Sequence, residues 1–437
     1  MEDYSILSIV PPVLSIFLAV YTRNIIISLT LGTLSGTLIL TNYNPFFAIV
    51  SLMEDHIFVQ VSNPSNTQVI LITLIIGGFV GILEYSGGAK AFSSMIVKFI
   101  SNPMRGQLAA WISGLSIFFT DTGNSLIVGP LFRPVFHELK ICREKLAYII
   151  DTTAAPVTIL IPVASWGVYI MSLIENSYRD MGIEGDAFSV LLAVWPYQFY
   201  ALLAVISVPM IVMTGKDFGL MAKAQRQYIK DEKEGIFDEI KAEIQESEQP
   251  KLIMVILPFS VMAISLITII GYFAFNEGVK SVHVNSGLCI SYILASIGCA
   301  YVMKRYQNIA INVAIDQFFK GMGQLISVAA ILALAWALSS ICRDLHTGEY
   351  LATLVGDHLD PRFFPVVVFF IGALMSFATG SSYGTFAILM ATTLPVAQIL
   401  DADLVLCIAA ILSGGLFGDH TSPISDTTVL ASMGAGC

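Results

Sequence analysis

The stretch GDHTSPISDTT at residues 418–428 decides the fold class, because it carries two aspartates and a histidine directly after an apolar run. That run, LVLCIAAILSGGLF at 404–417, reads as membrane-embedded. Pro423 interrupts any helix that continues through both segments, since proline lacks a backbone N–H and clashes with the preceding turn. Residues 404–433 are therefore predicted to form a transmembrane helix that is broken part-way along.

The whole chain has the composition of a membrane protein. Of its 437 residues, 56% are hydrophobic and only 12% are charged, whereas a soluble domain has about 45–50% apolar and about 25% charged residues. The predicted class is an all-α polytopic membrane protein embedded in the lipid bilayer. The net charge of -10 comes from acidic residues in connecting segments, and no pattern indicates a nucleic-acid partner. The six scattered cysteines lack metal-site spacing and are predicted to be packing residues.

Apolar runs long enough to cross a bilayer form two sets with one shared order. Each set has three spans, then two short apolar segments joined by a polar hinge, then a long run interrupted by proline. The hinged pairs, 107–137 around TDTGNS and 364–399 around TGSS, are predicted re-entrant hairpins. The broken helices are 145–174, with Pro156 and Pro162, and 404–433. The remaining predicted spans are 5–21, 24–40, 67–86 and 188–213 in the first set, and 252–276, 284–303 and 322–342 in the second.

This shared order predicts an internal repeat. Residues 1–213 form the first repeat, residues 214–251 an amphipathic linker, and residues 252–437 the second repeat. Thr122-Gly123-Asn124-Ser125 resembles Thr379-Gly380-Ser381-Ser382, and 152–156 can be aligned with 419–423. Paired interrupted segments of this kind indicate the binding site of a transporter. The second repeat lacks a counterpart of 188–213, so we expect the native chain to continue past Cys437.

The distribution of basic residues predicts the orientation, because cytoplasmic loops are enriched in Lys and Arg. With the linker 214–251 in the cytoplasm, only Arg179, Lys280, Arg343 and Arg362 of the 22 basic residues fall outside. The N-terminus is then outside, and the two hairpins enter from opposite sides, so the repeats are inverted. The linker either simply joins the repeats or has a regulatory or dimer-contact role. Gly32 with Gly36, and Gly77 with Gly81, have the spacing of closely packed helices.

Four aspartates at predicted membrane depth are the candidate functional residues: Asp121, Asp151, Asp419 and Asp426. An ionisable side chain there costs roughly 2.5–3.5 kcal/mol on insertion scales, and no Lys or Arg lies near the predicted midplane. The aspartates are therefore predicted to hold Na⁺, protons, or each in turn. Na⁺ prefers oxygen ligands, as other hard cations do. The neighbouring candidates are Thr122, Asn124, Ser125, Thr152, Thr153, His420 and Ser422, with Gly123, Thr379, Gly380, Ser381 and Ser382 at the hairpin tips.

Several of these residues also have a structural interpretation. Asp121 could order the hairpin turn, as aspartates often do. Ser422 before Pro423 is also a good helix N-cap. His420 could either make a structural hydrogen bond or handle protons, since its intrinsic pKa lies near neutrality.

At four motifs the chain resembles the NhaC-type Na⁺/H⁺ antiporter family of the ion transporter superfamily. The motifs are FFTDTGNSLIVGP (118–130), DTTAAPVTILIPVASWG (151–167), FATGSSYGTFA (377–387) and GGLFGDHTSPISDTTVLASM (414–433). The resemblance implies a bacterial inner-membrane secondary transporter, a homodimer whose transport domain moves as an elevator. It leaves two substrate classes open: Na⁺ exchanged for H⁺, or a small organic acid such as malate or lactate, or an amino acid, carried with Na⁺.

An enzyme is not expected, because the sequence has no paired nucleophile and base, no metal-ligand spacing and no glycine-rich phosphate loop. No cofactor is expected either. Na⁺ is expected to be the transported ion and not a cofactor.

Overall fold

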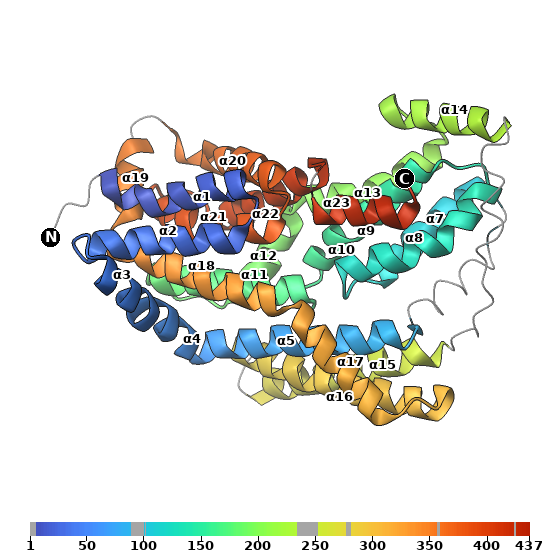
Figure 1. Cartoon of the computed structure of the whole chain (residues 1–437), viewed down its shortest axis with the longest axis horizontal. Helices are drawn as coiled ribbons and strands as arrows, with labels where there is room; N and C mark the ends of the chain where they lie inside the picture. The colour runs from blue at the N-terminus through green and yellow to red at the C-terminus, as the bar shows by residue number, and fades with distance from the viewer. Residues whose placement is uncertain are drawn as a thin grey trace.

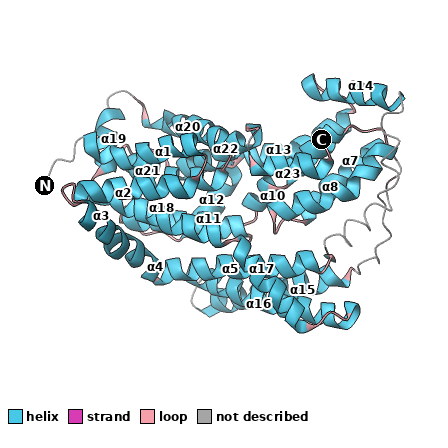
Figure 2. Ribbon diagram, in the orientation of Figure 1, coloured by secondary structure: helices cyan, strands magenta, loops and turns pink. Residues whose placement is uncertain are grey.

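The computed structural model describes residues 6–88, 100, 102–233, 252–276, 281–355, 359–423 and 425–437. Every regular element within those residues is a helix (Figure 2). By length and apolar composition, six of these helices could cross a membrane, or up to nine if each of three strongly bent pairs is one span. This set of apolar helices is that of a multi-pass membrane protein.

The helices of the first half are the following. They are η1 Ile6–Ile9, α1 Val10–Thr22, α2 Ile25–Leu40, α3 Pro45–Ser51, η2 Leu52–Phe58, α4 Val59–Ser62, α5 Pro64–Tyr85, α7 Pro103–Ser116, α8 Asp121–Glu138, α9 Arg143–Thr153, α10 Ala155–Leu160, α11 Ser165–Asp180, α12 Ala187–Val194, η3 Trp195–Tyr197, α13 Phe199–Thr214 and α14 Gly219–Lys233.

The second half adds the remaining helices. They are α15 Ile253–Asn276, α16 Ser281–Gln307, α17 Ile311–Gln324, α18 Ile326–Asp344, α19 Thr347–Val355, η5 Pro361–Phe363, α20 Phe364–Thr379, α21 Ser382–Ile399, α22 Leu404–Thr421 and α23 Asp426–Ala435.

The helices form two groups (Figure 1). Helices α5, α15, α16 and α17 pack on one another along one side of the molecule. The larger group contains α7–α13 and α18–α23. Within it, α20 and α21 lie toward the end of the long axis where the N-terminus lies, whereas α7 and α8 lie toward the opposite end.

Glycine spacing explains the close packing inside these groups, as the sequence predicted. A Cβ atom at Gly77 would lie 2.6 Å from the carbonyl oxygen of Gly321, so α5 and α17 touch backbone to backbone. A Cβ atom at Gly32 would lie 1.8 Å from Ser15 Oγ, which places α2 directly against α1.

The two hinges of the paired helices are shorter than the sequence suggested. The TDTGNS segment is mostly helical, because α8 begins at Asp121 and the Thr120 side chain accepts a hydrogen bond from Gly123 N. This capping satisfies one of the free N–H groups at a helix start. In the second pair, α20 ends at Thr379 and Gly380 follows with φ 66°, a left-handed conformation that favours glycine, before α21 begins at Ser382.

Two broken helices lie beside these pairs. In the first, α9 ends at Thr153 and α10 begins at Ala155, and α9–α10 is bent by 47° relative to α11. In the second, α22 ends at Thr421 and α23 begins at Asp426, so the break contains Pro423. Asp151 and Asp419 each lie in the last turn of the helix before a break.

Two segments depart from the predicted elements. The span expected at 188–213 is two helices, α12 and α13, bent by 49° around η3. Trp195 in η3 donates its indole N–H to Leu160 O at 2.9 Å, which fixes the bend against α10. The chain also turns by 115° between Ile25–Leu40 and Pro45–Ser62. In the linker, α14 covers 219–233, and residues 234–251 lie outside the described part of the chain.

Candidate ion-binding site

Asp419 sits at the end of α22 and is 1% exposed. Its carboxylate accepts hydrogen bonds from Ser425 Oγ at 3.0 Å and Thr427 Oγ1 at 3.1 Å. The two hydroxyl groups also contact each other at 2.9 Å. The second break therefore folds back on Asp419 through hydroxyl groups from the start of α23.

Asp151 belongs to the first half of the chain but contacts the same helix. Its Oδ2 atom accepts a hydrogen bond from Thr428 Oγ1 of α23 at 3.3 Å. Its Oδ1 atom is buried with no hydrogen-bond partner among the described residues. Helix α23 thus joins the two broken helices, with Thr427 on one carboxylate and Thr428 on the other.

His420 lies beside both carboxylates. Its Nδ1 atom is 3.2 Å from the hydroxyl oxygen of Tyr200 on α13, and the ring is within electrostatic range of Asp151. Its Nε2 atom is buried and has no hydrogen-bond partner among the described residues. The ring of Tyr200 packs edge-on against His420, with centroids 5.6 Å apart. The imidazole ring therefore contacts α13 through Tyr200 and lies within electrostatic range of Asp151.

The first hairpin is tied to the first break by Asn124. This fully buried side chain donates from Nδ2 to Gly114 O at 2.9 Å and to Thr153 O at 2.8 Å, joining α7, α8 and α9. Its Oδ1 atom and the hydroxyl of Ser125 are buried without a hydrogen-bond partner in the described structure. The hydroxyls of Thr152 and Thr153 donate to backbone carbonyls of their own helix, so only their lone pairs remain for a ligand.

The described contacts of Asp121 are with residues of α11 and α5. Its Oδ2 atom accepts a hydrogen bond from Trp166 Nε1 of α11 at 3.2 Å, and it lies within electrostatic range of Glu84 on α5. The Glu84 carboxylate also lies against Gly123, where a Cβ atom would be 2.2 Å from Oε1. Glu84 therefore brings an acidic group from the α5 bundle to the start of α8. Whether Asp121 shares an ion with Asp151 and Asp419 stays a prediction.

The second hairpin contacts the second break. Ser422 Oγ donates to Phe377 O of α20 at 2.7 Å, so its hydroxyl joins the end of α22 to α20. Thr379 and Ser382 are buried, and the Ser382 hydroxyl has no hydrogen-bond partner among the described residues. Gly380 and Ser381 form the short turn between α20 and α21.

Two predicted site residues have no described side chain. Thr122 lies in the first turn of α8 and Asp426 is the first residue of α23, but their side chains lie outside the described part of the structure. Their roles stay predictions. Among the residues that are described, no three His, Cys, Asp or Glu side chains gather as a metal site. A cation bound here would need hydroxyl, amide or backbone oxygens beside the carboxylates.

Sequence reasoning missed three residues of this region: Tyr200, Trp166 and Glu84. Tyr200 and Trp166 lie in apolar stretches, where an aromatic residue indicates packing and carries no signal of a polar role. Glu84 lies near the end of the predicted span 67–86, and the structure places its carboxylate against Gly123. An acidic residue inside a predicted span was the signal that could have identified it.

Comparison with known sequences identifies relatives of this chain. A model of the Na⁺/H⁺ antiporter family matches residues 157–437. An uncharacterized protein of Haemophilus influenzae is 31% identical over 450 residues, which covers 99% of this chain and 86% of that protein. A malate-2H⁺/Na⁺-lactate antiporter of Bacillus subtilis is 32% identical over 143 residues, covering 32% of this chain and 28% of that protein.

Solved structures show the same fold at low sequence identity. The YdaH transporter of Alcanivorax borkumensis aligns with a TM-score of 0.61 and 13% identity, covering 89% of this chain and 81% of that one. MtrF of Neisseria gonorrhoeae, from a class of antimetabolite efflux pumps, aligns with a TM-score of 0.57 and 13% identity, covering 89% and 77%. Both of these neighbours are transport proteins.

The matched part of the chain includes α11, both helices of the second hairpin and the second break. The match begins after Asp151, so it does not include the first hairpin or this carboxylate. The structure connects them to the matched part of the chain, because α23 contacts both α8 and Asp151. The chain belongs to the Na⁺/H⁺ antiporter family.

Proposed function

We propose that this protein is a secondary transporter that exchanges Na⁺ for H⁺ across the cytoplasmic membrane at a site built on Asp151 and Asp419. One observation carries the proposal. Two carboxylates from different halves of the chain lie at two helix breaks, and hydroxyl groups from the single helix α23 bind both. Ionisable groups at membrane depth persist where they bind ions or relay protons.

The same carboxylates suit either ion. A carboxyl group removed from water retains a proton more readily, whereas a bound cation favours the charged form. One site can therefore carry Na⁺ or H⁺ but not both at once, which is the requirement for exchange. Buried oxygens of Asp151, Asn124 and Ser125, which have no hydrogen-bond partner among the described residues, would supply further ligands to a dehydrated Na⁺.

We further propose that the chain is built from two inverted repeats and that its transport domain moves as an elevator. The opposite placement of α7–α8 and α20–α21 along the long axis supports the inverted repeats (Figure 1). In this proposal α5, α15, α16 and α17 form the static scaffold. The hairpins, the broken helices and the ion site move past that scaffold as one unit.

The proposed orientation places α14 in the cytoplasm and the N-terminus outside. In support, α14 lies toward the end of the molecule where α7 and α8 lie (Figure 1), and Tyr228 of α14 contacts His137 of α8 at 2.7 Å. The protein is proposed to act as a homodimer in the inner membrane. Exposed apolar side chains of α15, including Ile264, Ile267 and Phe275, would face lipid or the second copy.

A second candidate function is Na⁺-coupled transport of a small organic acid or amino acid. The similarity to the Bacillus subtilis malate-2H⁺/Na⁺-lactate antiporter favours it. The buried hydroxyls of Ser376 and Ser382 beside the second hairpin turn, for which the described part of the chain shows no partner, would be the donors for a substrate carboxylate.

The deciding experiment measures Na⁺-driven pH change in proteoliposomes. We expect Asp151→Asn and Asp419→Asn each to reduce the flux to the level of empty vesicles, because an amide holds neither a proton nor a cation in the same way. Asp316→Asn, at an exposed position on α17, is the matched control. Retained flux in both site variants would defeat the proposal. Uptake of labelled lactate, malate or amino acids in the same vesicles would support the second candidate.

A further inference from the structure

Helix α14 carries a row of basic residues along one side. Lys223, Arg226 and Lys230, here called the basic row, are spaced by three and four residues, so they share one face of the helix and extend over about 10 Å. All three are exposed, and they line an open hollow of about 570 Å³. Residues 218–230 contain no acidic residue, although the whole chain has a net charge of -10. The outer side of α14 is therefore a local region of positive charge.

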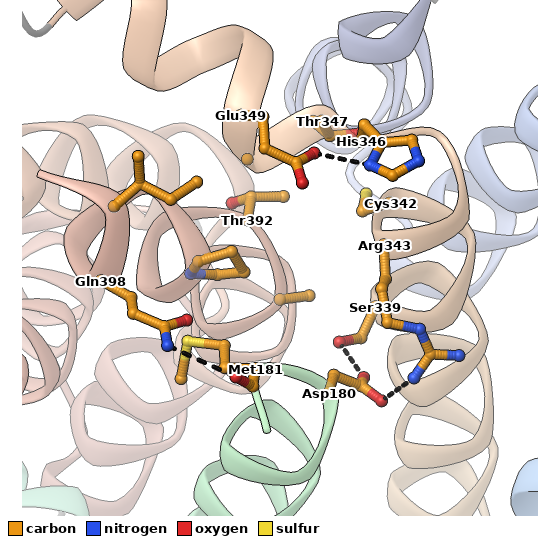
Figure 3. Close-up of a pocket in the computed structure, with 14 residues that line it drawn as sticks. Asp180, Met181, Ser339, Cys342, Arg343, His346, Thr347, Glu349, Thr392 and Gln398 are labelled. Carbon is orange, nitrogen blue, oxygen red and sulfur yellow. Dashed lines mark hydrogen bonds and ion pairs between the residues drawn. The ribbon is translucent and has the colours of Figure 1, made fainter. Parts of the chain in front are cut away.

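The protein does not neutralise this charge. Among the residues that the structure describes, no side chain of the basic row forms an ion pair. Other exposed basic groups are paired: Arg343 binds Asp180 Oδ1 at 2.5 Å in the cavity drawn in Figure 3. Asp217 lines the same hollow as the basic row, but its Oδ1 atom binds Lys145 of α9 at 2.5 Å. The positive charge of the row is thus left for a ligand of opposite charge.

The opposite face of α14 is bound to the rest of the protein. The Gln225 side chain donates from Nε2 to Lys140 O at 2.7 Å and accepts at Oε1 from Cys142 N at 2.9 Å. One turn later, the Tyr228 hydroxyl oxygen contacts His137 Nδ1 of α8 at 2.7 Å. At about 100° per residue, these two contact positions lie on the side of the helix opposite the basic row. The contacts with the α8–α9 connection therefore direct the row away from the protein.

The start of α14 lies close to the end of a candidate membrane span. Helix α13 forms such a span together with α12, and near its end Met210 and Met213 are exposed, as on a helix that faces lipid. Only residues 215–218 separate α13 from α14, so the two ends lie within about 20 Å of each other. At this start, Leu220 is 85% exposed and Phe218 is 62% exposed. Large apolar side chains beside basic ones are typical of a helix at a membrane surface.

We propose that α14 is a docking surface for anionic phospholipids, with the basic row on the lipid phosphate groups and with Phe218 and Leu220 beside the acyl chains. Each Lys or Arg near an anionic membrane surface strengthens binding by about fivefold, whereas a lipid without net charge gives only the apolar contact. Because the opposite face of α14 is bound to the α8–α9 connection, a bound lipid is linked through α14 to the helix that ends at the first break. This binding does not depend on which ion is transported, so it stands independently of the exchange proposed above.

The test measures whether lipid covers position 220. Leu220→Cys, in a full-length variant without the six native cysteines, is reacted with an uncharged maleimide in nanodiscs that each hold one copy of the protein. The discs contain either phosphatidylcholine alone or phosphatidylcholine mixed with phosphatidylglycerol. We expect the reaction to be at least about fivefold slower in the mixed discs, and glycerol phosphate added to the phosphatidylcholine discs to have no such effect. Equal rates in the two kinds of disc, or protection by free glycerol phosphate, would overturn the proposal.

A second variant assigns the protection to the basic row. Lys223→Gln, Arg226→Gln and Lys230→Gln, made together at exposed positions in the same background, should restore the rate seen in phosphatidylcholine discs. Fewer positive charges make a thiol less reactive, so a faster reaction in this variant has to come from greater exposure. Lys304→Gln with Arg305→Gln, exposed at the end of α16, is the control and should keep the protection. Protection that persists without the basic row would contradict the proposal.

Discussion

At the scale of single residues, Asp151 and Asp419 are held in different ways. Among the described residues, Asp419 accepts hydrogen bonds from two hydroxyl groups of its own break, whereas Asp151 accepts one long hydrogen bond and has a second, buried oxygen for which that part of the chain shows no partner. A buried acceptor without a partner is costly. In the proposed function, Asp151 is therefore the carboxylate with more to gain from an arriving cation or proton.

Tyr200 gives a prediction at the same scale. Its hydroxyl is the described partner of His420 Nδ1 at 3.2 Å, and Tyr200→Phe removes it without changing the shape of the ring. One hydrogen bond contributes about 0.5–1.5 kcal/mol, so Na⁺-driven proton flux should fall by about two- to tenfold. Initial rates of pH change in proteoliposomes measure this.

Tyr197→Phe serves as the matched control, because that ring is 41% exposed and lies on η3. A Tyr200→Phe protein that transports at the same rate as the Tyr197→Phe protein would show that the contact with His420 is only structural.

At the scale of elements, α23 is the helix that joins the two halves of the site. Besides its contacts with both carboxylates, it packs directly on α8. A Cβ atom at Gly129 would lie 2.3 Å from the carbonyl carbon of Gly434, and one at Gly434 would lie 2.4 Å from Ser125 O. The two backbones touch because neither position carries a side chain.

Gly129→Ala is therefore predicted to displace α23. Because the clash is with backbone and not with a flexible side chain, we expect a loss of about 1–3 kcal/mol, typical of an overpacked core, together with slower exchange. Thermal unfolding of the detergent-solubilised protein measures the first effect. Gly271→Ala on α15 is the control, since a Cβ atom there meets nothing within 4 Å. Equal melting temperatures for the two variants would refute the contact.

The elements also show what the sequence could and could not predict. Proline and polar hinges predicted the segments in which the chain breaks or turns, because those residues disrupt helices locally. The start of α8 lies a few residues earlier than the sequence suggested, because Thr120 caps the helix at Asp121 and makes most of TDTGNS helical. The bend at η3 could not be foreseen, since it depends on the distant contact of Trp195 with Leu160 O.

In the candidate site, too, some residues could be predicted from the sequence and others could not. Asp151 and Asp419 could be predicted as candidate site residues because each is a charged residue in an apolar segment. In the structure both lie at helix breaks and both contact α23. Tyr200 was missed because its polar role depends only on which helix packs beside His420, and that is a property of the folded chain.

At the scale of the whole molecule, one of the contacts that join the proposed scaffold to the proposed moving part is a hydrogen bond from α16. Tyr292 of α16 donates its hydroxyl to Val163 O, in the connection between α10 and α11, at 2.8 Å. An elevator cycle has to break this contact in every turnover, because the two residues lie on opposite sides of the sliding surface.

A cross-link at this point should therefore stop transport. We expect the Val163→Cys, Tyr292→Cys pair, placed in a variant without the six native cysteines, to lose exchange when treated with a bifunctional thiol reagent. The flux should return on reduction. Each single-cysteine variant treated in the same way is the control, and full exchange in the linked protein would rule out relative movement of α16 and this connection.

The hydroxyl pair on Asp419 has one more consequence. Ser425 and Thr427 now point their hydrogens at the carboxylate, but the same oxygens carry lone pairs that a cation can use. Rotating an O–H bond turns a donor into a ligand while every heavy atom stays in place. Loaded and empty forms of this half of the site can thus share one backbone, distinguishable only by where the hydrogens lie, as neutron diffraction would reveal.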